Sequence, residues 1–178
     1  PSMPIKFWND KGDKRYKSAY FEKYKNVWHH GDFAKITNNG GFIIFGRSDT
    51  TLNPGGVRIG TAEIYRVVEA FDEVSDSLVI GQDWNGDQRV VLFLKLSQDI
   101  LKVNNNLTDK IKQSIRKNCS PRHVPSIIIQ INDIPYTISG KKVEVAVKKI
   151  IDGEDVTNRD ALANPDSLDL YKEIPELT

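Results

Sequence analysis

The chain has 178 residues, with 25 Lys and Arg against 24 Asp and Glu and a formal net charge of +1 at pH 7. This length suits one ordinary domain plus a short appendage, and the near-neutral balance excludes the broad basic field that nucleic acid or an acidic membrane would need. The single cysteine, Cys119, excludes an intramolecular disulfide and favours a reducing, cytoplasmic compartment, and we recognise neither a membrane-spanning apolar run nor a signal peptide.

The first thirty residues are rich in aromatic and basic types and have no sustained period, apart from a short helix expected around Ala19 to Lys23. This segment needs a partner to cover it. The turn cluster "TNNG" precedes an apolar run, which predicts a strand from Phe42 to Gly46. A second short strand is expected from Val57 to Ile59.

Apolar residues at helical spacing predict a helix from Ala62 to Ala70, with Thr61 as its N-cap. Two apolar runs follow, at 75–84 and 88–96, and the intervening Asn85-Gly86 is a strong hairpin signal. We therefore expect two antiparallel strands. A further helix, capped by Thr108, ends before Pro121.

The run "SIIIQIN" predicts a buried strand after the rigid loop "SPRHVP". The loop "PYTISGKK" then leads into "KVEVAVKKII", which fits a helix or a strand; Lys148 and Lys149 near its end favour the helix. The order of elements predicts a small α+β domain at 49–178, with a mixed or antiparallel sheet flanked by helices. Residues 1–48 are expected to be the remnant of a larger domain, and the chain a piece of a longer polypeptide.

The stretch "GRSDTTLNPGGVRIGTAEIY" places Arg47, Asp49 and Arg58 around the pair Gly55-Gly56, directly before a helix. Arginines bind phosphates through their planar fork, and glycines let a backbone approach a ligand closely. This stretch therefore predicts a nucleotide site beside a narrow passage.

Three separated motifs, "WHHGDF", the stretch above and "IPYTISGKK", resemble in order and spacing the last three signature motifs of the adenylate-forming acyl-CoA synthetase superfamily. The amino-acid sequence is most similar to that of superfamily members that activate acetoacetate. The resemblance implies two steps: the acid and ATP, with Mg²⁺, give an acyl-adenylate and pyrophosphate, and coenzyme A then displaces AMP. It also implies that this chain is the mobile C-terminal lid, and that a large N-terminal adenylation domain with the phosphate loop and the acid pocket lies outside it.

The resemblance gives three residues to the nucleotide. Asp32 matches the aspartate that accepts hydrogen bonds from the ribose hydroxyls, and its structural alternative is a turn aspartate. Arg47 matches an arginine that reaches ribose and phosphates. Its structural alternative is a surface ion pair with Asp49. Arg58 matches an arginine close to the nucleotide during thioester formation. His30 stands where the family often has threonine, and a metal pair with His29 is not expected because neighbours on a strand point apart.

Other matches concern the lid's movement and coenzyme A. Asp49 matches the hinge about which the lid rotates. Its structural alternative is an ordinary turn residue. Gly55 and Gly56 match glycines that line the pantetheine tunnel; their structural alternative is a plain turn. Arg116 and Arg122 match basic positions near the nucleotide end of coenzyme A; their structural alternative is that of ordinary surface arginines.

The resemblance gives the catalytic role to Lys141, which would pair with the acyl carboxylate and α-phosphate oxygens during adenylation. Lys142 is the neighbouring alternative for this role. Without a catalytic role, Lys141 would be an ordinary solvated lysine of a loop. No metal-binding residues are expected. Two other functions stay open: the lid of an acetyl- or other short-chain acyl-CoA synthetase, and a non-catalytic α+β interaction module.

Overall fold

The computed structural model describes residues 3–98, 100 and 102–178, apart from the side chain of Phe45. The chain divides into two compact units, one ending at Asp32 and the other running from Phe33 to Thr178. The contacts thus divide the chain after Asp32, whereas the sequence predicts a functional boundary at Asp49. The boundary at Asp49 stays a prediction.

The first unit contains a short helix and a cluster of aromatic rings. Helix α1 spans Lys14–Phe21 and follows the 3-10 turn η1, Lys11–Asp13. It begins earlier than the expected Ala19 to Lys23 because the Asp10 carboxylate accepts the backbone N–H groups of Arg15 and Tyr16. Edge-to-face contacts join the rings of Phe7, Tyr16 and Tyr20.

The second unit begins with a two-stranded hairpin. Strand β1 (Asp32–Ile36) pairs with β2 (Phe42–Arg47). Its turn uses Gly40 at φ +78°, and the Thr37 N–H donates to the Gly41 carbonyl over 2.8 Å. The strand expected from Phe42 to Gly46 is therefore confirmed as β2, whereas β1 was not predicted.

The remaining elements form a small α+β domain. In chain order they are η2 (Pro54–Gly56), α2 (Thr61–Val68), β3 (Val74–Trp84), β4 (Asp87–Leu96), α3 (Asn105–Asn118), η3 (Pro121–His123), β5 (Ile127–Gln130), α4 (Glu144–Ile151), η4 (Arg159–Ala161), η5 (Pro165–Tyr171) and η6 (Pro175–Leu177). Strands β3 and β4 are antiparallel, and β5 joins β4 in parallel. The predicted α+β fold with a mixed sheet is confirmed.

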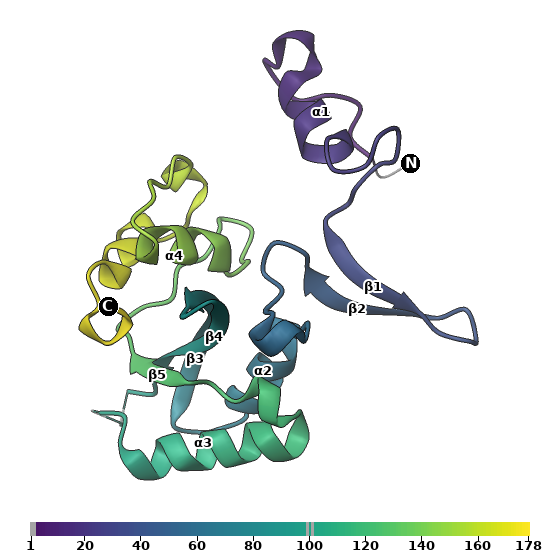
Figure 1. Ribbon diagram of the computed structural model, residues 1–178. Coiled ribbons are helices and arrows are strands. Elements are labelled where there is room, and N and C mark those ends of the chain that lie inside the picture. The colour runs from purple at the N-terminus through teal and green to yellow at the C-terminus, as the bar shows by residue number, and fades with distance from the viewer. Residues whose placement is uncertain (1–2, 99, 101) are drawn as a thin grey trace. The chain divides into compact units, whose positions relative to one another are not determined.

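The three-stranded sheet β3-β4-β5 lies between helices, with α3 on one face and α4 on the other (Figure 1). Along β4 the side chains alternate between two apolar cores: Leu92 packs with α2 and α3, and Phe93 packs with α4 and the C-terminal segment. A strand buried on both faces explains the near-continuous apolar run. Among the described residues, no helix is long and apolar enough to cross a membrane.

Three local predictions are wrong. Val57 to Ile59 forms no strand but one bridge between Leu52 and Ile59, because the turn at Pro54–Gly56 returns the chain at once. Thr61 lies inside α2, whose N-cap is Gly60. Thr108 lies inside α3, whose N-cap is Asn104, and the Asn104 side chain accepts the Leu107 N–H.

Candidate functional site

Arg47, Asp49 and Lys141 line one cavity of about 480 Å³ in the second unit. The cavity lies between the turn after β2, the loop that contains Lys141, and the start of α4. The other polar residues of its wall are Thr50, Thr137, Lys142, Glu144, Lys149, Thr157 and Asn158, and the apolar part is Val143, Val145, Ala146, Val156, Ala161 and Leu162. The fold thus brings together three predicted site residues that are about ninety positions apart in the chain.

Arg47 and Asp49 are paired in a two-point contact. Arg47 Nε donates to Asp49 Oδ1 over 3.1 Å, and Nη2 donates to Oδ2 over 3.0 Å. Both side chains are about half exposed, so the pair contributes only about 0–1 kcal/mol to stability. The ion pair that the sequence offered as an alternative therefore exists, and it is weak enough for a phosphate ligand to replace.

The adjacent lysines have opposite environments. Lys141 is exposed, and within the described part of the chain its ammonium group has no ion pair. Lys142 is 15% exposed in its side chain and donates to Asp76 Oδ1 over 2.6 Å and to Glu69 Oε1. A withdrawn, paired ammonium cannot reach a ligand without breaking these bonds, so Lys141 is the lysine free to act at the cavity.

Gly55 and Arg122 meet in a second cluster. The Gly55 N–H donates to both oxygens of Asp87, at 2.9 and 3.1 Å, and Gln88 Oε1 accepts the Asn53 N–H over 2.6 Å. The bonds from Gln88 and Gly55 hold the pKa of the Asp87 carboxyl below its usual value. The β3-β4 hairpin therefore fixes the "NPGG" turn.

The two glycines of that turn differ in what surrounds them. Both have positive φ, +58° at Gly55 and +76° at Gly56. A Cβ on Gly55 would overlap the Arg122 guanidinium, whereas a Cβ on Gly56 would meet no atom within 4 Å. A side chain at Gly56 would thus project into open space.

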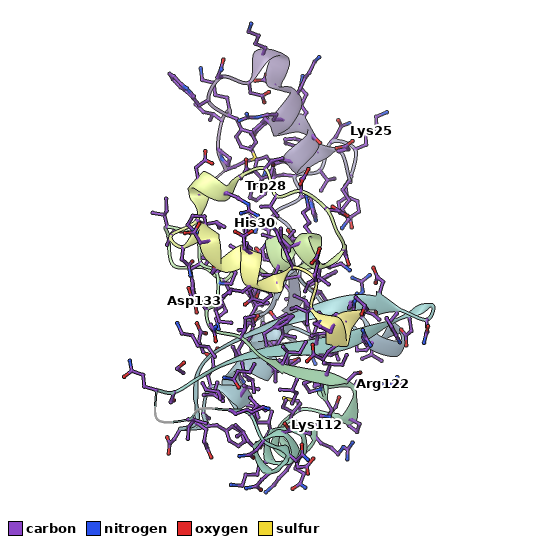
Figure 2. All side chains as sticks on the ribbon, turned by 90° about the vertical axis from the view of Figure 1, so that its left-hand side faces the viewer. Lys25, Trp28, His30, Lys112, Arg122 and Asp133 are labelled. Carbon is purple, nitrogen blue, oxygen red and sulfur yellow. The ribbon has the colours of Figure 1, made fainter. Side chains whose placement is uncertain are left out.

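The segment that carries Arg122 is held by a histidine. Arg122 lies between α3, where Lys112 is located, and β5 (Figure 2). His123 Nε2 contacts Glu63 Oε2 over 2.8 Å, and His123 Nδ1 contacts Ser120 Oγ over 2.8 Å. Glu63, at the start of α2, therefore helps to position the Arg122 segment.

The other predicted residues lie elsewhere. The Arg58 guanidinium carbon is 4.6 Å from the centroid of the Phe33 ring, a cation–π contact. Arg116 is exposed in the last turn of α3, and the structure brings it into no contact with the Gly55 cluster among the described residues. In the first unit, His30 Nδ1 contacts Asp32 Oδ2, so one oxygen of this carboxylate already has a partner.

Several residues around these clusters were not predicted from the sequence, notably Asp76, Asp87 and Asn164. Each is a short polar residue whose partner is distant in the chain, and no local pattern marks it. In the described part of the chain, no group of three or more His, Cys, Asp or Glu side chains is arranged to hold a metal ion.

Comparison with known proteins gives a consistent set of relatives. The chain is 56% identical over 177 residues to an acetoacetyl-coenzyme A synthetase of Rhizobium meliloti (strain 1021), and 55% identical over 179 residues to an acetoacetyl-CoA synthetase of Xenopus tropicalis. Each match covers 99% of this chain but only 27% and 26% of the relative, so the chain spans about a quarter of their length. No family model matches.

Solved structures agree with these relatives. An acetoacetyl-CoA synthetase from Streptomyces lividans matches with a TM-score of 0.88 and 43% identity, over 97% of this chain and 26% of that protein. A benzoate CoA ligase from Burkholderia xenovorans LB400 matches with a TM-score of 0.65 at 23% identity, over 83% of this chain and 28% of that protein, which indicates a shared fold.

Proposed function

Because this chain belongs to the acetoacetyl-CoA synthetase family, we propose that it is the C-terminal part of an acid–CoA ligase. The complete protein would activate acetoacetate with ATP, releasing pyrophosphate, and then transfer the acyl group from AMP to coenzyme A. ATP would enter with Mg²⁺ as part of the substrate.

The observation that carries this proposal is the free ammonium group of Lys141 at a cavity that Arg47 and Asp49 also line. During adenylation a carboxylate attacks the α-phosphate, and negative charge accumulates on oxygens around the phosphorus. A lysine aimed at these oxygens stabilises the transition state more than the ground state. Its long, flexible stem also lets the charge be withdrawn when the lid turns.

Three residues would serve the nucleotide. Asp32 would accept the ribose hydroxyls with its two carboxylate oxygens, in place of the contact from His30. Arg47 would exchange its weak pair with Asp49 for ribose and phosphate oxygens. Arg58 would contact the nucleotide during thioester formation, and its stacking on Phe33 supports an oriented guanidinium.

The thioester step would use the second cluster. Gly56 would form part of the wall of the pantetheine passage, where the open space beside its Cα fits a narrow ligand. Gly55 would keep the turn closed against Asp87. Arg122, and Arg116 on α3, would attract the phosphates at the nucleotide end of coenzyme A.

The lid would rotate about Asp49, which separates residues 1–48, the end of the N-terminal adenylation domain, from residues 49–178, the lid. The partner of this chain would thus be its own N-terminal domain, and its ligands would be small molecules in the cytoplasm. Two alternatives have less support, a lid selective for acetate or another short-chain acid and a non-catalytic module, because the relatives from Rhizobium meliloti and Caenorhabditis elegans, at 56% and 46% identity, are both named as acetoacetyl-CoA synthetases.

The proposal is tested by Lys141→Ala in the complete protein. Pyrophosphate exchange with acetoacetate should fall by on the order of a hundredfold or more, the usual effect of losing one preorganised electrostatic group. The matched control is Lys110→Ala, which removes an exposed lysine of α3 that does not line the cavity and should leave the exchange rate within about twofold. Equal losses in the two variants, or no acetoacetate-dependent exchange by the unaltered protein, would contradict the proposal.

A further inference from the structure

Both ends of the loop that carries Lys141 are bound to a single carboxylate on β3. Tyr136 and Lys142 form an antiparallel bridge that closes the loop. Tyr136 Oη donates to Asp76, at 2.9 Å from Oδ2 and 3.1 Å from Oδ1, and Lys142 Nζ donates to Asp76 Oδ1 over 2.6 Å. Asp76 therefore holds the entering and the leaving strand of the loop at one point.

Between these two strands the loop is closed by its own hydrogen bonds. The Thr137 N–H donates to the Lys141 carbonyl over 2.8 Å, and the Lys141 N–H donates to Thr137 Oγ1 over 3.0 Å. Gly140, at φ +76°, donates its N–H to the Thr137 carbonyl. The backbone of Lys141 is thus fixed relative to Asp76, and only its side chain is left to move.

The attachment to Asp76 is withdrawn from solvent and charged. Asp76 is 19% exposed and Lys142 is 15% exposed in their side chains, and the ammonium group lies 4.4 Å from the centroid of the Tyr65 ring. Burial alone would lower the pKa of Lys142, but hydrogen bonds to Asp76 and Glu69 outweigh burial and raise it. Moving the ammonium group away from Asp76 leaves this carboxylate, whose side chain is only 19% exposed, without its cation, so the attachment resists deformation.

We propose that Asp76 is a positioning residue for adenylation: by binding Tyr136 and Lys142 together, it sets the place from which Lys141 reaches its ligand. The inference rests on the proposed role of Lys141. Asp76 does not line the cavity itself, so its effect must pass through the loop that it holds. A shift of about 1 Å in a group that stabilises a transition state can cost on the order of a hundredfold in rate.

The test uses the complete protein and measures the two half-reactions separately. Asp76→Asn keeps the shape of the side chain and removes its charge, and Tyr136→Phe removes one donor with less risk to folding. Both variants should reduce the kcat of pyrophosphate exchange by on the order of tenfold, with little change in KM, and should leave thioester release from supplied acetoacetyl-adenylate within about twofold. Glu69→Gln is the matched control, since it removes a carboxylate partner of Lys142 that does not bind Tyr136, and it should reduce exchange less.

The double variant Asp76→Asn with Lys141→Ala decides whether Asp76 acts through Lys141. If it does, adding Asp76→Asn to Lys141→Ala should have no further effect on exchange. A further tenfold loss, or equal losses in both half-reactions, would overturn the positioning role while leaving the proposed function intact. If Lys141→Ala alone fails to suppress exchange, the proposed function itself is wrong.

Discussion

At the scale of single residues, the pair Lys141 and Lys142 shows what the sequence can and cannot decide. Motif position favours Lys141, but both are lysines in the same loop, and composition does not distinguish them. Burial does: Lys142 is bound to Asp76 and Glu69, and Lys141 is exposed at the cavity. The assignment therefore depends on partners that lie more than sixty residues away in the chain.

Asp133 gives a prediction on pH. Its carboxylate accepts Lys95 Nζ over 2.7 Å and Asn164 Nδ2 over 2.6 Å, and the residue, labelled in Figure 2, lies in the segment after β5. Burial would raise the pKa of Asp133, but these hydrogen bonds outweigh burial and hold it below its usual value near 3.8. A lowered pKa in the folded state means that the stabilisation is complete above the unfolded pKa and is lost as the pH falls through the folded one.

Asp133→Asn should therefore destabilise the chain at pH 7 by only about 0.5–1 kcal/mol, since both partners of the ion pair are more than a third exposed. The difference from the unaltered chain should shrink as the pH falls below about 4 and through the lowered pKa of Asp133. Urea unfolding at a series of pH values measures it, and Lys95→Met should show the same trend. A difference that stays constant down to pH 2 would contradict the assignment.

At the scale of elements, the sequence predicted those that depend on local signals. Asn85-Gly86 marks a hairpin because both residues adopt positive φ, and the structure has them at 50° and 78°. The run "KVEVAVKKII", whose sequence fits a helix or a strand, forms the predicted helix, α4. The caps were misassigned by one residue at α2 and by four at α3, because a polar residue inside a helix resembles a cap when only spacing is known.

The sequence proposed residues that would face a ligand, a role that stays a prediction, but it did not indicate the residues that hold them in place. The residues that hold the predicted site residues lie on other elements. Asp87 at the start of β4 binds the turn at Gly55, and Asn164 binds Tyr136 at the beginning of the loop that carries Lys141. Asn164 accepts the Tyr136 N–H over 2.8 Å, so the C-terminal segment also supports the lysine loop. No periodicity connects such pairs, because they form only once the sheet has assembled.

The turn at Pro54–Gly56 gives a prediction at the same scale. In the complete protein, Gly56→Leu should slow thioester release from supplied adenylate by on the order of a hundredfold, because a branched side chain would fill the proposed pantetheine passage. Adenylation should change little, since Gly56 does not line the cavity at Lys141. The measurement is thioester release beside pyrophosphate exchange.

Gly153→Leu is the matched control. Gly153 also has a positive φ, +77°, and open space around its Cα, so leucine meets the same backbone strain of about 1–2 kcal/mol there. It follows α4 and belongs to no proposed passage. Equal losses of thioester release in the two variants would attribute the effect to strain and remove Gly56 from the passage.

At the scale of the whole molecule, the proposed function requires one small domain to serve two steps. Under this proposal Lys141 serves one step and Gly56 the other, and they lie on different loops of the α+β domain that follows β2. A rigid unit can present two loops in turn only if it rotates as a body, and a few residues at its boundary must take up the change in dihedral angles. The turn from Arg47 to Thr50, closed by the Thr50 N–H on the Arg47 carbonyl, is where we place that change.

Two substitutions at Asp49 separate backbone rotation from side-chain chemistry. Asp49→Pro fixes φ and restricts Ser48 before it, so the complete protein should lose at least tenfold in overall turnover and in one half-reaction, the one whose lid orientation the proline disfavours. Asp49→Ala removes the contact with Arg47 but leaves the backbone free, and both half-reactions should stay within a few-fold of the unaltered protein, because a half-exposed ion pair contributes little. Pyrophosphate exchange, thioester release and overall turnover, measured on both variants, decide between the two. If alanine is as harmful as proline, the carboxylate matters and not the rotation, and if proline leaves both half-reactions unchanged, the hinge lies elsewhere in the chain.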